Sequence, residues 1–195
     1  MKKYISLSIL AILFIACNDK STTNNSFEKL SKTQSSIAHS FKTIDSLWNQ
    51  GVVNVDQFDR FISEALAFYE KYPEESLSPD MLNNAANLSL TLANYYKQLD
   101  NDESPSNMAK YANQAITLYD LIIKVYPDYK HLSAVYLNKA ILYDDILGDK
   151  ASAEQEYREY LHKFPNDPAN ESFGDYLQND LIGKSAEEIY DSFKK

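Results

Sequence analysis

The residue types that carry most enzyme chemistry are sparse in this 195-residue chain, and their spacing fits few kinds of site. The three histidines, His39, His131 and His162, are far apart, and none has the partner at i+4 that a helical zinc motif needs. Two identical carboxylate residues stand side by side at Glu74-Glu75, Asp144-Asp145 and Glu187-Glu188. Neighbouring side chains on a helix diverge, whereas a glycosidase needs two carboxyls facing across a cleft. We therefore interpret these pairs as turn and surface charge.

The acidic segment from Asp100 to Ser104 is similar to the opening of a calcium loop. However, Pro105 stands where such a loop needs glycine, and Tyr111 stands where it needs glutamate. We interpret the segment as a solvated insertion. No serine lies in a Gly-x-Ser-x-Gly motif, and the four glycines are too dispersed for a phosphate-binding loop. The sequence therefore predicts no catalytic set, no metal and no cofactor, and we expect a protein that is not an enzyme.

The charge balance also restricts the partners of the chain. It has 28 Asp and Glu against 19 Lys and Arg, which gives a formal net charge of −9. A nucleic-acid-binding protein needs a basic face, so nucleic acid is not expected as a partner.

The N-terminal residues form an address signal. Lys2 and Lys3 precede an apolar run over residues 4–16 that is too short to span a bilayer and is typical of a signal peptide. The run ends in Phe14-Ile15-Ala16-Cys17, which resembles the lipobox of bacterial lipoproteins, although leucine is usual at the first position. That resemblance implies a cleaved signal peptide over residues 1–16 and a lipid on Cys17, the only cysteine. Residues 17–25 would form the lipidated cysteine and a flexible tether.

The same resemblance implies a place in the Gram-negative envelope, with the membrane as a partner through the N-terminal lipid. In the sorting rule of many such lipoproteins, Asn18 in place of Asp favours the outer membrane. We expect the protein to face the periplasm and leave surface exposure open. Loss of Lys2 and Lys3 would change the net charge from −9 to −11.

From Ser26 onward, apolar residues recur at helical spacing, and residues 26–195 are predicted to form a single all-α domain. The predicted helices run from Ser26 to Gly51, Asp56 to Pro73, Pro79 to Leu99, Asn107 to Tyr126, His131 to Leu147, Lys150 to Phe164 and Ala169 to Leu181, with a short one near Ser185 and Glu188. Asp100 to Ser106 is predicted as a polar loop. The short turns predict antiparallel helical hairpins.

An internal repeat is the strongest pattern in the chain. Ala115-x3-Tyr119-x7-Pro127 recurs 38 residues later as Ala153-x3-Tyr157-x7-Pro165, and Tyr72-Pro73 supplies a third aromatic-proline ending. The preceding helices also align, since Leu92-Ala93-x2-Tyr96 matches Lys139-Ala140-x2-Tyr143. From the tyrosine to the alanine of the second helix there are ten steps in the later unit and 19 in the earlier one, and the difference of nine is the Asp100 loop.

These residues resemble the tetratricopeptide repeat (TPR), most clearly over residues 79–165, if one extra residue is allowed before Gly148 in the later unit. The resemblance implies antiparallel helical hairpins stacked as a short TPR-like solenoid of about three hairpins plus C-terminal capping helices. Whether Ser26 to Pro73 is a true repeat stays open. The combination of lipobox and repeats is similar to the TPR lipoproteins of outer-membrane assembly.

By the same resemblance, the first helix of each hairpin lines a concave groove. The implied groove residues are Asn87, Leu90, Asn94, Lys97 and Gln98 in the earlier unit, and Leu137, Ile141, Asp144 and Asp145 in the later one. A mixed apolar and amide groove fits an extended peptide or a partner helix. We therefore expect a non-catalytic scaffold or adaptor that docks another envelope protein or peptide. The alternatives are an unoccupied groove, or a small-ligand-binding, glycan-binding or cell-wall-acting protein that uses a helical-repeat fold.

Overall fold

The computed structural model describes residues 24–50, 52–99, 102–178, 182 and 184, and this part of the chain is all-helical, as predicted, with no strand. The helices are α1 (Asn24–Asn49), α2 (Val55–Lys71), α3 (Ser78–Gln98), α4 (Ser104–Val125), α5 (Leu132–Ile141), the π-helix η1 (Leu142–Leu147), α6 (Lys150–Lys163) and α7 (Asn170–Gln178). The predicted signal peptide, Cys17 and the helix near 185–188 lie outside the described residues. α1 begins at Asn24, inside the predicted tether.

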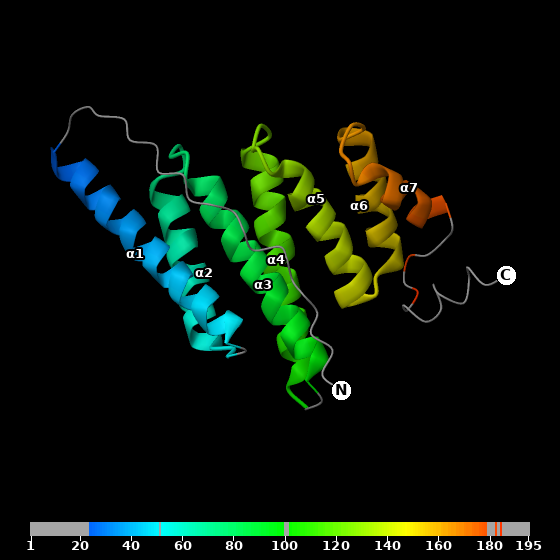
Figure 1. The fold of residues 1–195 in the computed structure, drawn as a ribbon, viewed down its shortest axis with the longest axis horizontal. Coiled ribbons are helices and arrows are strands. Elements are labelled where there is room, and N and C mark those ends of the chain that lie inside the picture. Colours follow the sequence, from blue (N-terminus) through cyan, green and yellow to red (C-terminus); the bar gives the residue numbers. More distant parts are fainter. Residues whose placement is uncertain (1–23, 51, 100–101, 179–181, 183, 185–195) are drawn as a thin grey trace.

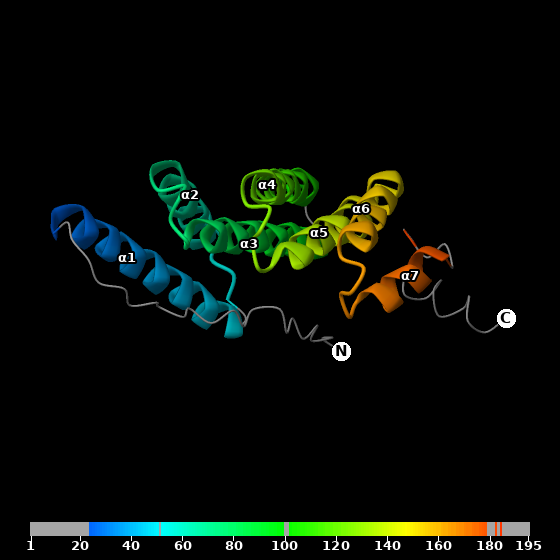
Figure 2. The ribbon, with the colours of Figure 1, turned by 90° about the horizontal axis from the view of Figure 1, so that it is seen from above.

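Successive helices run in alternating directions along an elongated array (Figure 1). Viewed from above, α2, α4 and α6 lie on one side, and α1, α3, α5 and α7 lie on the other (Figure 2). α3 and α4 form the most extensive helix pair. Fully buried alanines on these two helices let them approach closely: Ala85, Ala86, Ala93, Ala112 and Ala115. The main core therefore lies between the two layers.

Helix starts follow local capping chemistry. The Asn54 side chain accepts the Gln57 amide at 3.2 Å at the start of α2, and Asp149 caps α6 in the same way. Pro105 lies in the first turn of α4. The prediction of a loop as far as Ser106 was therefore wrong at its end, because a proline in the first turn lacks only an amide that would have had no helical partner.

Three junctions between hairpins share one backbone hydrogen-bond pattern, and each starts at an aromatic residue that precedes a proline. The aromatic amide binds the carbonyl four residues earlier, the aromatic carbonyl accepts the amide three residues later, and that residue's carbonyl accepts the amide three further on. The amide–carbonyl pairs, at 2.8–3.1 Å, are Tyr72–Phe68, Glu75–Tyr72 and Ser78–Glu75; Tyr126–Ile122, Tyr129–Tyr126 and Leu132–Tyr129; and Phe164–Tyr160, Asp167–Phe164 and Asn170–Asp167. The chain thus makes the same turn three times, each leading into an odd-numbered helix.

Side chains reinforce two of these junctions in an equivalent way. The Ser78 hydroxyl donates to the carbonyl of Tyr72, and the Asn170 amide donates to the carbonyl of Phe164 at 2.6 Å. At the middle junction the corresponding residue is the buried Leu132. The Tyr126 hydroxyl instead donates to the carbonyl of Pro73 at 2.7 Å and ties the first two junctions together.

The helix predicted from His131 to Leu147 ends in a π-helix rather than in continuous α-helix. η1 spans Leu142–Leu147 and is closed by Gly148 in the left-handed conformation, with the Asp149 amide on the carbonyl of Tyr143 at 2.9 Å. A π-turn accommodates an added residue inside a helix without shifting what lies on either side. η1 therefore lies in the stretch where the TPR resemblance implies one extra residue before Gly148.

Replacing Gly148 by alanine is expected to lower the free energy of unfolding by about 1 kcal/mol. Gly148 has φ 64°, where a side chain is strained, although nothing lies within 4 Å of an added Cβ. Urea unfolding of the full chain would measure the loss. Gly148→Asn is the matched control and should lose less, because asparagine tolerates this conformation. Wild-type stability in Gly148→Ala would contradict the prediction.

Candidate functional site

The predicted groove residues on α3 divide between the surface and the helix interface. Asn94 is half-buried and Gln98 is exposed, so both are accessible. Leu90 is half-buried against the main core. The Asn87 side-chain oxygen accepts the Tyr119 hydroxyl at 2.8 Å and the Asn138 amide at 3.2 Å. Asn87 therefore joins α3 to α4 and α5, and its amide oxygen is already used inside the protein.

Lys97 and Asp145 connect α3 to η1. The Lys97 ammonium donates to the backbone carbonyl of Asp145. The pKa of the Asp145 carboxyl is raised by partial burial and by the neighbouring Asp144, and Lys97 opposes both effects. The structure therefore brings these predicted groove residues together from two hairpins.

The predicted residues of the later unit lie deeper than those of α3. Leu137 and Ile141 are half-buried and pack on a small second core. Asp144 is 6% exposed and accepts the hydroxyls of Tyr157 at 3.4 Å and Tyr176 at 2.8 Å. Burial raises the pKa of both tyrosines, and Asp144 raises it further, so they remain hydrogen-bond donors. Asp144 thus acts inside the protein, between η1, α6 and α7.

A buried ion-pair cluster was missed by the sequence analysis. The Lys139 ammonium lies 2.7 Å from an Asp120 oxygen and 2.6 Å from a Glu156 oxygen, with the Lys139 side chain 12% exposed and that of Glu156 9% exposed. Burial raises the pKa of Glu156, and Lys139 opposes the rise. The second carboxylate oxygen of Glu156 is buried and makes no hydrogen bond. The cluster joins α4, α5 and α6. In the sequence, the only indication of this ion-pair cluster was a lysine next to the small Ala140.

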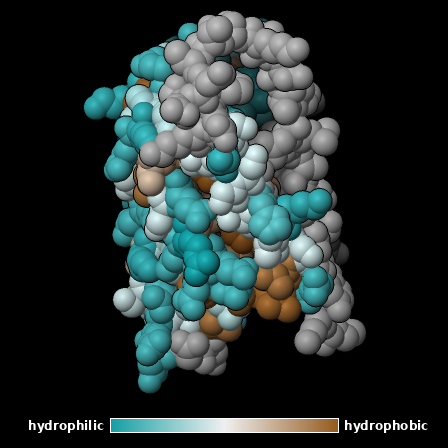
Figure 3. Space-filling model, turned by 90° about the vertical axis from the view of Figure 1, so that its left-hand side faces the viewer, coloured by the Kyte–Doolittle hydropathy of each residue, from teal (hydrophilic) through white to brown (hydrophobic). Residues whose placement is uncertain are grey.

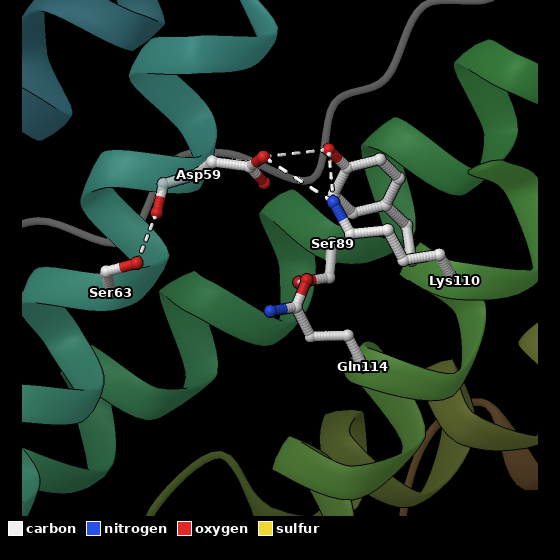
Figure 4. Close-up of polar contacts among 6 residues, drawn as sticks. Asp59, Ser63, Ser89, Lys110 and Gln114 are labelled. Atoms are coloured by element: carbon white, nitrogen blue, oxygen red, sulfur yellow. Dashed lines mark hydrogen bonds and ion pairs between the residues drawn. The ribbon is translucent and has the colours of Figure 1, made fainter.

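A second polar network joins α2, α3 and α4 (Figure 4). Asp59 accepts the Tyr111 hydroxyl at 3.1 Å and lies 3.6 Å from the Lys110 ammonium. Nearby, the Ser89 hydroxyl lies 3.3 Å from the Gln114 side-chain oxygen. Burial raises the pKa of Tyr111, and the hydrogen bond to Asp59 raises it further. This tyrosine therefore serves as a buried donor that links α2 to α4, and it has the opposite pKa shift from a nucleophile.

The three histidines lie far apart along the described part of the chain. His39 lies in α1, His131 caps α5 and His162 lies in the last turn of α6. Among the described residues, no group of three or more His, Cys, Asp or Glu side chains is placed to hold a metal ion. Over the same residues, no helix combines the length and the apolar character needed to cross a membrane.

The surface of the α1 end is largely hydrophilic, with a smaller hydrophobic area (Figure 3). Between α1 and α2 lies an open groove of about 470 Å³. Ile37, Ala67 and Phe68 are among the residues that line it, and Lys32 and Lys71 add charge.

Comparisons with protein-family models, with curated proteins and with solved structures find no match to this chain. Its functional interpretation therefore depends on what its own segments share, and above all on the three junctions with one hydrogen-bond pattern.

Proposed function

We propose that this protein is a lipid-anchored, non-catalytic scaffold of the bacterial envelope with a TPR-like arrangement of hairpins. Its first helices would dock another envelope protein or a peptide. The single observation that carries the proposal is the repeated junction after Tyr72, Tyr126 and Phe164. A junction repeated with one geometry stacks successive hairpins in one direction, which is the way repeat proteins build extended binding surfaces.

The repeated junction also supports a role for the first hairpin as a repeat. In this interpretation the units are α1 with α2, α3 with α4, and α5 and η1 with α6, and α7 is the first helix of a further unit. Alanines at the repeat positions of the sequence, Ala93, Ala115, Ala140 and Ala153, are all 0% exposed. They lie where a TPR-like unit needs small residues for close helix contact.

The proposed docking surface is the layer of odd-numbered helices, where α1 and α7 flank α3 and α5 (Figure 2). Its accessible residues combine the amides Asn94 and Gln98 with the exposed Ala134 and Asp145. Half-buried Leu90 lies on the same helix face as Asn94. Amide groups that bind main chain, next to apolar side chains, fit an extended peptide or a partner helix.

The anchor is proposed from Cys17 and the residues before it, and Asn18 favours the outer membrane, facing the periplasm or exposed at the surface. No specific observation favours the alternative, a glycan-acting or small-ligand-binding protein. The hollow over α6 is lined by Glu154 and Glu159, but both carboxylates belong to one helix and do not face across a cleft.

Substitutions on the proposed docking surface are expected to reduce partner recovery from detergent-solubilised envelopes about tenfold, which corresponds to about 1.4 kcal/mol of binding free energy. The variants are Asn94→Arg and Ala134→Arg, which place a bulky charge on α3 and α5. Asn113→Arg is the matched control, because Asn113 is exposed on α4 in the other layer. Recovery would be quantified by mass spectrometry, with helical circular dichroism as a check of folding. Equal recovery by all three variants and the wild type would overturn the docking proposal.

A further inference from the structure

The last described helix packs on its own small core. This second core has Ala140, Ala153, Tyr157 and Ile182 as its buried members. Tyr176 and Leu177 of α7 pack against it, beside Leu137, Ile141 and Tyr143. Neither α7 side chain is among the residues of the main core. α7 therefore packs, through Tyr176 and Leu177, on the same small core as the predicted groove residues Leu137 and Ile141.

The polar contact of α7 depends on the π-helix. The Tyr176 hydroxyl donates to Asp144 at 2.8 Å, and the Tyr176 ring lies 5.7 Å from that of Tyr157 with an interplanar angle of 68°. Asp144 belongs to η1. The seat for α7 thus has an apolar floor and one buried carboxylate that accepts a hydroxyl.

α7 itself is a weak helix. It has nine residues, fewer than the roughly 12–15 that an isolated helix needs to be even marginally stable. Gly174 lies inside it, with nothing within 4 Å of an added Cβ, so no neighbour explains the absence of a side chain. A glycine inside a helix reduces the equilibrium for helix formation about fivefold relative to alanine. The covering helix is therefore less stable than the surface it covers.

We propose that the surface under α7 is a helix-docking site and that α7 is its displaceable internal occupant. The partner is an amphipathic helix that presents a tyrosine followed by a leucine, as α7 does with Tyr176 and Leu177. Release of α7 removes Tyr176 and Leu177 from the second core and the Tyr176 hydroxyl from the carboxylate of Asp144. This inference rests on the proposed function, since it assigns regulation to the later half of the same groove.

The surface under α7 determines which kind of partner fits it. A nine-residue helix already fits it, and that helix presents a tyrosine hydroxyl to Asp144 and a neighbouring leucine to the second core, which a replacing helix would reproduce. A partner must also compete with a covalently attached segment. Its apparent affinity is therefore reduced by the fraction of molecules in which α7 is seated.

The test uses a fluorescein-labelled peptide with the sequence of residues 168–184, added to the full chain in detergent. Tyr176→Phe in the chain removes the hydroxyl from Asp144 and should tighten peptide binding about fivefold, the effect of about 1 kcal/mol for one hydrogen bond. Gly174→Ala in the chain should weaken it about fivefold. Fluorescence anisotropy measures both affinities. A peptide in which Tyr176 is replaced by alanine is the control and should not bind.

Hydrogen exchange supplies the second measurement. Amides of α7 should exchange faster than those of α3, faster still in Tyr176→Phe, and more slowly in Gly174→Ala, with α3 unchanged in all three chains. Equal protection of α7 and α3, or one peptide affinity for all three chains, would overturn the proposal. The peptide assay needs no cellular partner, so a failed capture experiment would refute the scaffold role and leave this result standing.

Discussion

Lys139→Met is expected to lower the free energy of unfolding by about 3–5 kcal/mol, the usual effect of removing one partner from a buried ion pair. Lys139 neutralises Glu156 where the Glu156 side chain is only 9% exposed. Without the lysine, that carboxylate would be buried next to no opposite charge. Asp120 is more than half exposed and can turn to water, so the penalty falls on Glu156. Urea unfolding followed by circular dichroism would measure the loss.

The double variant Lys139→Met, Glu156→Met is the control for this prediction. Replacement of a buried ion pair by apolar side chains of similar size is often neutral, so this variant should recover most of the lost stability. If it is as unstable as Lys139→Met alone, packing rather than an uncompensated charge explains the effect.

The loss of stability in Lys139→Met should depend on pH, and the ionisation of Glu156 sets the direction. Burial raises the pKa of Glu156, so the folded chain holds the proton more firmly than the unfolded chain. Stability from such a group is present at low pH and is lost as pH rises through the pKa of the folded state. Lys139 lowers the pKa of Glu156, so its loss lets burial raise that pKa further. The penalty of Lys139→Met should therefore be smaller at about pH 5 than at about pH 7.

Cys17→Ser is expected to move the protein from the membrane fraction to the soluble fraction. The proposed anchor is a lipid on the Cys17 sulfur, and a serine hydroxyl at this position would not receive it. Stable membrane attachment usually needs two lipid chains or one chain with a basic patch, and the chain is acidic. Fractionation after cell lysis, with incorporation of a labelled fatty acid, would measure both attachment and acylation.

Ser21→Ala is the matched control for the anchor, because it changes the tether and leaves the lipobox intact. It should stay in the membrane fraction and keep the labelled lipid. If Cys17→Ser still sediments with membranes, something other than a lipid on Cys17 holds the protein there.

Most helix boundaries were predictable because they depend on local chemistry. Helices α2, α4 and α6 end one residue before the aromatic that precedes Pro73, Pro127 and Pro165. A proline disfavours helical conformation in the residue before it, so these ends can be located without tertiary information. The start of α4 was misplaced because Pro105 was assigned to the loop rather than to the first helical turn.

The TPR resemblance also implied one extra residue before Gly148, but it did not show the structural consequence. An added residue can lengthen a turn or widen a helix into a π-turn, and the alignment does not distinguish the two. Here it widens the helix, and Asp144 lies in the interior where the TPR resemblance implied a groove position.

By itself, the sequence determined the all-α class, the helix ends at the prolines and the repeated placement of alanine, aromatic and proline, because these follow from backbone restrictions and helical spacing. Only the tertiary structure decided that Lys139 meets Glu156 and that Asp144 receives the Tyr176 hydroxyl. These features require side chains or backbone groups from segments whose distance depends on how the helices pack. Helical periodicity shows which face of a helix is apolar, whereas a partner on another helix is set by packing.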